Sequence, residues 1–186
     1  MQTLITGAQV DQETLVSIAD CKAHMRVTHA HEDTLIGLLR NAAVSYVEQN
    51  CDTKLGSYTA QVYLPQFRSF WFTIGPVSAI SSVEYQATAD DAVWSTLDSS
   101  LWYKDIRQAP DRMAFRDTPT LYEYALAPVR VNCTLGYATM PPDMVAAIKL
   151  LVAHLYENRQ EEIVGAMTSR LKLGIDALLA PYRTLT

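Results

Sequence analysis

The stretch of residues 33–64, DTLIGLLRNAAVSYVEQNCDTKLGSYTAQVYL, decides the fold class because its hydrophobic period changes midway. Up to Asn50, apolar residues recur every three or four positions, as they do on a helix with one buried side. From Tyr58 to Leu64 they alternate with polar residues, as they do on a strand with one buried face. We therefore predict an α+β fold, with helix and sheet in separate segments of the chain.

The same two periods extend outward from this stretch. Upstream, Ser17 and Asp20 have the spacing of a capping box, which predicts the start of a short helix. Downstream, Pro141-Pro142-Asp143 predicts the start of another helix, and a last helix is expected after Gly174. Alternating runs predict strands at 58–64, 70–74, 83–87 and 129–135, and weaker ones at 93–97, 101–106 and 121–124.

These segments predict a central, mostly antiparallel β region, with N- and C-terminal helices that pack together as a helical core. We expect one domain over residues 1–186. It comprises a polar, aperiodic arm at 1–14, a helical region at 15–51, the β region at 57–135 and a second helical region at 141–183.

The composition excludes several classes of protein. The 186 residues hold 15 basic and 20 acidic side chains, for a net charge of −5, without a cluster of Lys and Arg. Duplex-DNA binders need such clusters to neutralise phosphates. No apolar run approaches the roughly 18 residues of a membrane span. The first seven residues lack the features of an export signal. We expect a protein made in the cytoplasm, without membrane contact.

The sequence holds no recognisable set of catalytic residues. It has neither a GxSxG nucleophile motif nor a glycine-rich phosphate loop. His29 and His31, beside Glu32 and Asp33, form the one cluster that suggests a metal, but a helix start accounts for the two acids. We predict no enzyme activity, no cofactor and no metal.

The cysteines and one aromatic run indicate packing. Cys21, Cys51 and Cys133 are widely spaced and form no CxxC pair, which predicts reduced, buried thiols. The run Phe70-Trp71-Phe72 could stack on nucleic-acid bases, but the one cation near it is Arg68. Packing in a core or an interface is the favoured interpretation.

Several stretches occur in a characteristic order, among them DCKAHMRV at 20–27, GPVSAISSVEY at 75–85, GY at 136–137 and LLAPYR at 178–183. In this order they resemble the head–tail connector family of tailed bacteriophages, also called adaptor or head-completion proteins. The similarity covers about residues 14–183. Two departures are Met25, where leucine is usual, and Lys172-Leu173-Gly174, where members often carry a proline.

The resemblance implies a non-enzymatic virion protein at the head–tail interface. Such subunits form a ring, commonly twelvefold, below the portal protein. The ring extends the DNA channel, lets DNA pass without sequence-specific binding, and docks the tail-completion, stopper or tail-terminator protein. The alternative function is a phage DNA-packaging accessory protein that contacts nucleic acid directly.

Six residues are candidate interface residues. Two lie four apart on a predicted helix and could pair with Asp33 or Glu48, two lie at the expected exposed end of a long helix, and two belong to the closing segment. That segment reaches the portal if the resemblance holds, so truncation after Arg170 is expected to leave a folded chain that no longer docks there. The six are Lys22, Arg26, Tyr156, Arg159, Tyr182 and Arg183.

Overall fold

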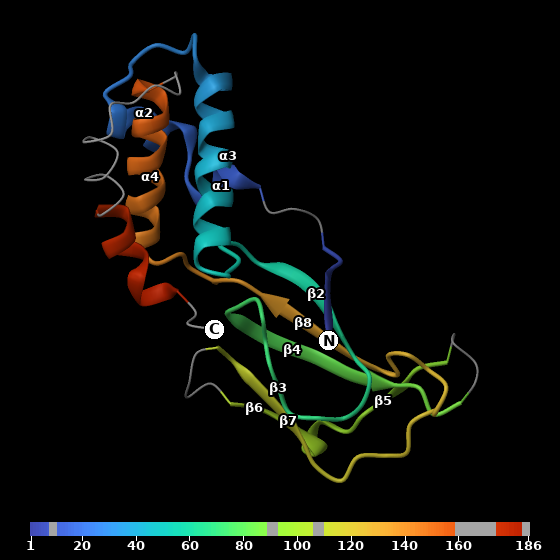
Figure 1. Cartoon of the computed structure of the whole chain (residues 1–186). Helices are drawn as coiled ribbons and strands as arrows, with labels where there is room; N and C mark the ends of the chain where they lie inside the picture. The colour runs from blue at the N-terminus through green and yellow to red at the C-terminus, as the bar shows by residue number, and fades with distance from the viewer. Residues whose placement is uncertain (8–10, 89–92, 106–109, 159–173, 184–186) are drawn as a thin grey trace. The chain divides into compact units, whose positions relative to one another are not determined.

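A computed structural model describes residues 1–7, 11–88, 93–105, 110–158 and 174–183 (Figure 1). The chain divides into two compact units. The β unit comprises Met1–Gln9 and Gly56–Ala138, and the helical unit comprises Val10–Leu55 and Thr139–Thr186. This arrangement confirms the predicted α+β fold. The single domain over residues 1–186 stays a prediction, and each unit is described by itself.

The β unit contains two antiparallel sheets. The first has five strands in the order β1 (Gln2–Ile5), β2 (Tyr58–Leu64), β8 (Val129–Leu135), β4 (Val77–Tyr85) and β5 (Ser95–Thr96). The second has three strands in the order β3 (Phe70–Trp71), β7 (Arg112–Phe115) and β6 (Trp102–Asp105), and a short 3-10 helix, η1 (Ser99–Leu101), precedes β6.

The two sheets enclose one apolar core. Along β2 and β8, every second residue is buried, as the alternation in the sequence predicts. Phe72, which follows β3, and Met113 of β7 pack into the same cluster as Val83 of β4. The buried residues of this core are Ala60, Val62, Leu64, Phe72, Val77, Val83, Leu97, Met113, Val129, Val131, Cys133 and Leu135.

A half-buried ion pair ties the smaller sheet to the larger one. The Asp111 carboxylate accepts a hydrogen bond from the Val77 backbone N–H at 2.7 Å, and its other oxygen lies 3.4 Å from Lys104 Nζ. Lys104 Nζ also donates to the Val77 carbonyl. Asp111 precedes β7, Lys104 lies on β6 and Val77 begins β4, so this contact joins the small sheet to the start of β4.

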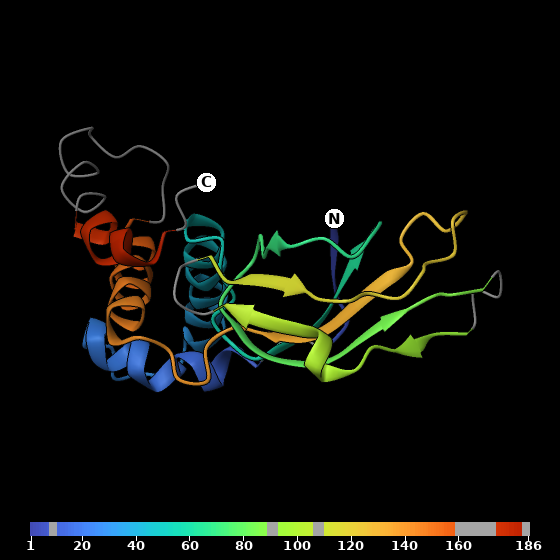
Figure 2. The ribbon, with the colours of Figure 1, turned by 90° about the horizontal axis from the view of Figure 1, so that it is seen from below.

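The helical unit is built from α1 (Gln12–Leu15), α2 (Ile18–Met25), α3 (Asp33–Asn50) and α4 (Pro142–Glu157). Residues 174–179 are also helical and continue into the 3-10 helix η2 (Ala180–Tyr182). The helices α3 and α4 lie side by side, with α2 packed against both (Figures 1 and 2). None of the helices within the described ranges has the length and apolar character that a bilayer span requires.

The predicted capping box at the start of α2 is confirmed. The Ser17 hydroxyl accepts a hydrogen bond from the Asp20 N–H at 2.9 Å and donates to the Asp20 carboxylate at 2.7 Å. The hydrogen bond from Ser17 and the nearby Lys149 ammonium lower the pKa of the Asp20 carboxyl. The sequence pattern was sufficient here because both partners lie within four residues.

A buried arginine joins α1, the start of α2 and α3 close to this capping box. Arg40, in the middle of α3, is only 7% exposed. Its guanidinium donates to the Glu13 carboxylate, the Val16 carbonyl at 3.3 Å and the Asn41 side chain at 3.3 Å. Glu13 also accepts from the Ile18 N–H at 3.0 Å, so one carboxylate joins α1, the start of α2 and α3.

Three sequence predictions were wrong in detail. Residues 1–14 were expected to be an irregular arm, but they contain β1, which pairs with the outer edge of β2, and α1. Residues 121–124 form a turn instead of a weak strand, and the strand at 70–74 ends after Trp71. The short strand β7 was missed. β1, β7 and the turn at 121–124 have backbone partners in distant segments, which local periodicity does not reveal. The four residues of α1 are too few to show a helical period.

Loss of the Glu13 carboxylate is expected to destabilise the helical unit. In Glu13→Ala, the buried Arg40 guanidinium loses its carboxylate and the Ile18 N–H loses its acceptor, so the free energy of unfolding falls by about 1–3 kcal/mol. Urea unfolding followed by circular dichroism measures the change. The matched control is Glu157→Ala at the exposed end of α4, expected within about 0.5 kcal/mol of the parent chain. Equal effects of the two variants would contradict the role of Arg40.

All three cysteines are free and buried, as predicted. Burial raises the pKa of Cys133 to about 11, from an ordinary value of 9.0. Between these values the unfolded chain loses the proton that the folded chain keeps. The contribution of this thiol to stability is therefore complete below pH 9.0 and is lost as the pH rises toward 11.

This difference predicts a fall in the free energy of unfolding of about 1–2 kcal/mol between about pH 8 and about pH 10.5 from Cys133 alone. The measurement is urea unfolding under reducing conditions at both pH values. Because other groups titrate in this range, the parent chain is compared with Cys133→Ala, whose stability should fall less over the same interval. An equal fall in both chains would show that the thiol does not contribute.

Candidate functional site

In the predicted histidine cluster, the two acidic residues, Glu32 and Asp33, already bind other side chains of the chain. The rings of His29 and His31 stack with centroids 5.7 Å apart. Glu32 accepts a hydrogen bond from the Tyr156 hydroxyl, and Asp33 pairs with Lys22 at 2.7 Å. In the part of the chain that the structure describes, no group of three or more His, Cys, Asp or Glu residues is arranged to hold a metal ion. The features that stand out are surfaces.

The outer side of the three-stranded sheet carries two aromatic rings paired with two arginines. The Arg112 guanidinium lies 5.4 Å from the centre of the Trp71 ring, and the Arg116 guanidinium lies 5.2 Å from the centre of the Tyr103 ring. Trp71 is opposite Arg112 in register, and Tyr103 is opposite Ala114. Residues 112, 114 and 116 share one side because side chains alternate along a strand. We call Trp71, Tyr103, Arg112 and Arg116 the aromatic–arginine face.

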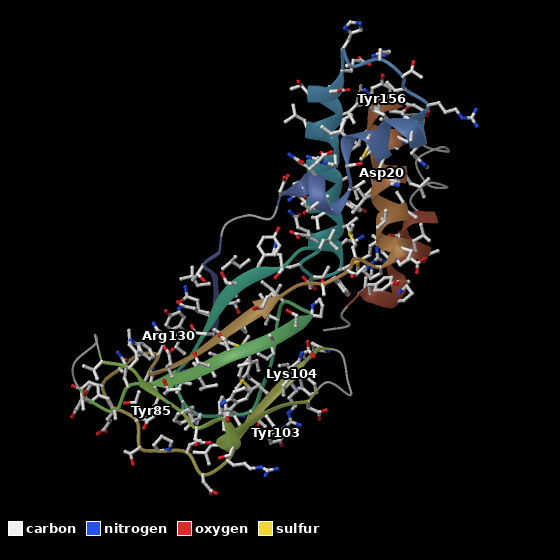
Figure 3. The ribbon with its side chains drawn as sticks, turned by 180° about the vertical axis from the view of Figure 1, so that it is seen from behind. Asp20, Tyr85, Tyr103, Lys104, Arg130 and Tyr156 are labelled. Atoms are coloured by element: carbon white, nitrogen blue, oxygen red, sulfur yellow. The ribbon has the colours of Figure 1, made fainter. Side chains whose placement is uncertain are left out.

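The aromatic–arginine face is open to solvent. Trp71 is 44% exposed and Tyr103 is 46% exposed. Its neighbour on β6, Lys104, takes part in the contact with β4 (Figure 3). Among the described residues, neither Arg112 nor Arg116 has a carboxylate at ion-pair distance. Trp, Tyr and Arg are the side chains most enriched at energetically important positions of protein interfaces.

A second surface is a turn between β7 and β8. Gln86, which follows β4 and is buried, closes the base of this turn with both of its backbone groups. Its N–H donates to the Pro128 carbonyl at 2.8 Å, and its carbonyl accepts from the Tyr122 N–H at 3.0 Å. Within the turn, the Ala125 N–H donates to the Tyr122 carbonyl at 3.3 Å. The segment that joins β7 to β8 projects from one end of the β unit (Figure 2).

This turn presents apolar side chains to solvent. Tyr124 is 80% exposed and Leu126 is 95% exposed, and Glu123 beside them is also exposed. We call Glu123, Tyr124 and Leu126 the tip. Large apolar side chains that gather on a hydrogen-bonded turn differ from those scattered singly over a surface, and they indicate a contact surface.

A third surface lies on α3 in the helical unit. Leu38, Ala42 and Tyr46 are exposed at a spacing of four residues, with Leu38 at 63% and Tyr46 at 43%. The sequence pattern of α3 combined these positions with Ile36 and Val47, which are fully buried. The helix is therefore apolar on two sides. Among the described residues of the helical unit, one of these sides is packed and the other is exposed.

By contrast, the arginine on the outer side of the five-stranded sheet is satisfied within the chain. Arg130 donates to Glu84 through Nε at 2.8 Å, and its guanidinium lies 4.2 Å from the centre of the Trp94 ring (Figure 3). Burial by itself lowers the pKa of Arg130, but the hydrogen bonds and negative charges of Glu84 and Tyr63 together outweigh burial, so the pKa is raised. Asn132 donates to the same carboxylate at 2.9 Å. This side of the sheet is thus internally paired.

Lys22 and Arg26, the first two predicted interface residues, do not share a helical face. Lys22 pairs with Asp33, one of its two expected partners. Arg26 follows the last helical residue of α2 and caps it in the left-handed conformation, with φ of 59°. Glu48, the other expected partner, instead binds Lys54 and the Leu55 N–H. The shared face and the pairing with Glu48 were therefore wrong.

Three of the other predicted residues make contacts inside the helical unit. Tyr156 is half-buried and joins α4 to Glu32, so it does not lie free at an exposed helix end (Figure 3). The Tyr182 hydroxyl donates to Asp143 at 3.1 Å, and Arg183 donates to Asp176 at 2.5 Å. Arg159 lies outside the described residues. The interface roles of all six residues stay predictions.

The closing segment also contributes to the core of the helical unit. Ile175 is 3% exposed and Leu179 is fully buried. Truncation after Arg170 would therefore remove core side chains together with Tyr182 and Arg183. Point variants of these two residues test a docking role without that loss.

The structure adds candidate surface residues that the sequence analysis missed, namely Tyr103, Arg112, Arg116, Tyr124 and Leu126. A signal existed for the arginines, because Arg112 and Arg116 alternate with Met113 and Phe115. Within the run Phe70-Trp71-Phe72, Phe72 is buried in the core, as the packing interpretation predicts. Trp71 faces outward, and its role in an interface stays a prediction.

The two units define a class of fold in which one chain carries an antiparallel β sandwich and a separate helical unit. The same fold occurs in chains of gene transfer agent (GTA) particles. A chain from the neck of an empty GTA particle computed with C6 symmetry has a TM-score of 0.78 and 22% identity, covering 100% of this chain and 97% of that one.

Two further structures of GTA particles contain chains with the same fold. A chain from the virion of a native GTA particle has a TM-score of 0.76 and 20% identity, covering 100% and 97%. A chain from the neck of a native GTA particle computed with C12 symmetry has a TM-score of 0.73 and 18% identity, covering 98% and 96%. No family model and no curated protein matches the sequence. The fold comparison agrees with the resemblance found in the sequence.

The tip is expected to contribute nothing to the stability of its own chain. In the double variant Tyr124→Ser, Leu126→Ser, the free energy of unfolding of the monomer should stay within about 0.5 kcal/mol per substitution. In Leu179→Ala, a fully buried side chain is truncated and the loss should be about 2–5 kcal/mol. Denaturant unfolding of dilute, monomeric protein compares them. A large loss in the double variant would show that the tip packs within the chain.

Proposed function

We propose that the chain is a structural, non-enzymatic head–tail connector (adaptor) subunit of a phage-like particle. It forms a ring in the neck, below the portal protein. The ring extends the DNA channel and docks the next connector or tail component.

The observation that supports this proposal most strongly is the fold match over nearly the whole chain. The matched chains come from structures of a particle neck and a virion, and two of these structures were computed with C6 and C12 symmetry. The sequence independently resembles a family whose members occupy the same position in tailed phages. A subunit repeated by rotation in a neck is common to both lines of argument.

The surfaces of the chain suit a ring subunit. A cyclic ring needs two different, complementary faces on each subunit, because every copy contacts its neighbours head to tail. The β unit carries an aromatic–arginine face and a separate apolar tip, and α3 carries the exposed stripe of Leu38, Ala42 and Tyr46. Exposed apolar surfaces of this kind are typical of chains that function in assemblies.

The charge of the chain suits a channel through which DNA moves. A net charge of −5 gives little attraction to phosphates, and each neutralised phosphate would add a binding contribution that retards sliding. The alternative, a DNA-packaging accessory protein, is favoured by one observation. Trp71 and Tyr103, each beside an arginine, could stack on bases of single-stranded nucleic acid.

Mass photometry and negative-stain microscopy of the purified chain test the proposal. We expect a ring of twelve copies, each of 20.8 kDa, with the chain alone or after addition of the portal protein. We also expect no mobility shift of DNA. A chain that stays monomeric in both preparations would contradict the ring function. A shift that weakens as salt is raised would favour the nucleic-acid alternative.

A further inference from the structure

We propose that the tip of one subunit binds the aromatic–arginine face of the next subunit around the ring. The occupant of the face is thus a second copy of this chain. This inference rests on the proposed ring function and assigns one contact within it. It pairs Glu123 with Arg112 and Arg116, and it places Tyr124 and Leu126 against Trp71 and Tyr103.

The first argument is the unmet charge of the face. Each guanidinium lies over an aromatic ring and, among the described residues, has no carboxylate at ion-pair distance. An arginine held on a ring face is well oriented to receive a carboxylate with two parallel hydrogen bonds. The face therefore fits a ligand that combines one carboxylate with apolar surface.

The tip has this combination of groups. Glu123 is exposed, and no ion pair joins it to another residue in the described part of the chain. Tyr124 and Leu126 stand beside it at 80% and 95% exposure. Burial of such side chains against Trp71 and Tyr103 would remove apolar area from water on both partners.

A neighbouring acid favours a protein partner over nucleic acid. The exposed Asp117 follows Arg116 in the chain, whereas Asp105, opposite Arg112 in register, has an interaction of its own. A phosphate chain would bring several negative charges close to the Asp117 carboxylate, whereas the tip brings one. Like charges brought together at an interface oppose binding, so the face discriminates against a polyanion.

The tip is held in shape before binding. The two hydrogen bonds of Gln86 close its base at Tyr122 and Pro128, and the Tyr122 and Tyr124 rings meet edge to face at 5.7 Å. A preformed turn loses little conformational entropy when it docks. The exposure of Tyr124 and Leu126 also shows that the tip does not cover the face of its own chain.

A tip and a face that are separate on one chain make a heterologous contact. Such head-to-tail contacts generate a closed ring when the rotation between copies closes. The contact is small beside the roughly 1,200–2,000 Å² of a stable interface, so it forms one part of the contact between neighbours.

Charge reversal with complementation tests the pairing. Variant A carries Glu123→Arg and so has a basic tip and a basic face. Variant B carries Arg112→Glu and Arg116→Glu and so has an acidic tip and an acidic face. Each variant alone should need a concentration at least about tenfold higher than the parent chain for half assembly. An equal mixture should recover assembly as rings in which A and B alternate.

The matched control is Glu157→Arg, which reverses a glutamate at the exposed end of α4 and should assemble like the parent chain. Circular dichroism melts of A, B and the control confirm that each is folded. Mass photometry counts the rings, and a mass tag on variant A reports its share in mixed rings, expected to be one half.

The outcomes separate the two proposals. If the parent chain forms no ring, alone or with portal protein, the ring function and this contact are both overturned. If the parent chain forms rings and variants A and B assemble equally well alone, only the contact is overturned. The same holds if the mixture fails to recover assembly. A DNA mobility shift that variant B loses while keeping its ring would assign the face to nucleic acid instead.

Discussion

Strand β8 is the element on which the β unit depends, because its two edges hold segments that lie far apart in the chain. It pairs with β2 on one side and with β4 on the other. Val131 and Cys133 face the core, and the start of β8 follows Pro128, one of the two points that close the tip. Strand β4 ends next to Gln86 and begins at Val77. The Val77 N–H donates a hydrogen bond to Asp111, and the Val77 carbonyl accepts one from Lys104. The β8–β4 pair thus positions both the tip and the small sheet that carries the aromatic–arginine face.

The helical unit depends on a polar contact in a similar way. Arg40 is buried, and the Glu13 carboxylate compensates its charge while also accepting a hydrogen bond from the first N–H of α2. Because this contact uses one side of α3, the opposite side keeps Leu38 and Tyr46 in solvent. In this pair only Arg40 is buried, since the Glu13 side chain is 46% exposed. The exposed apolar side of α3 is the side that is open to a partner outside the chain.

Much of the fold could be predicted because its signals are local. The capping box at Ser17, the helix at 33–50 and the strands at 58–64 and 129–135 follow from neighbours within a few residues. The elements that were missed, β1, α1 and β7, are four residues long and depend on pairing or contacts with distant segments. The candidate surfaces were missed for the same reason. Exposure of Tyr124 or Leu126 follows from the closure of a turn by Gln86, 36 positions before Tyr122.

The sequence by itself determined the class of this protein: α+β, without a catalytic motif, slightly acidic, and with an order of motifs that resembles phage connectors. These properties depend on composition, period and spacing, which are present before folding. The tertiary structure decided which side chains meet. It turned Tyr156, Tyr182 and Arg183 toward partners within the helical unit, and it placed Trp71 beside Arg112 and Tyr103 beside Arg116 on an open face. The exposure of a side chain depends on contacts between distant segments of the chain. For this reason the fold class could be predicted from the sequence, whereas the exposed surfaces required the tertiary structure.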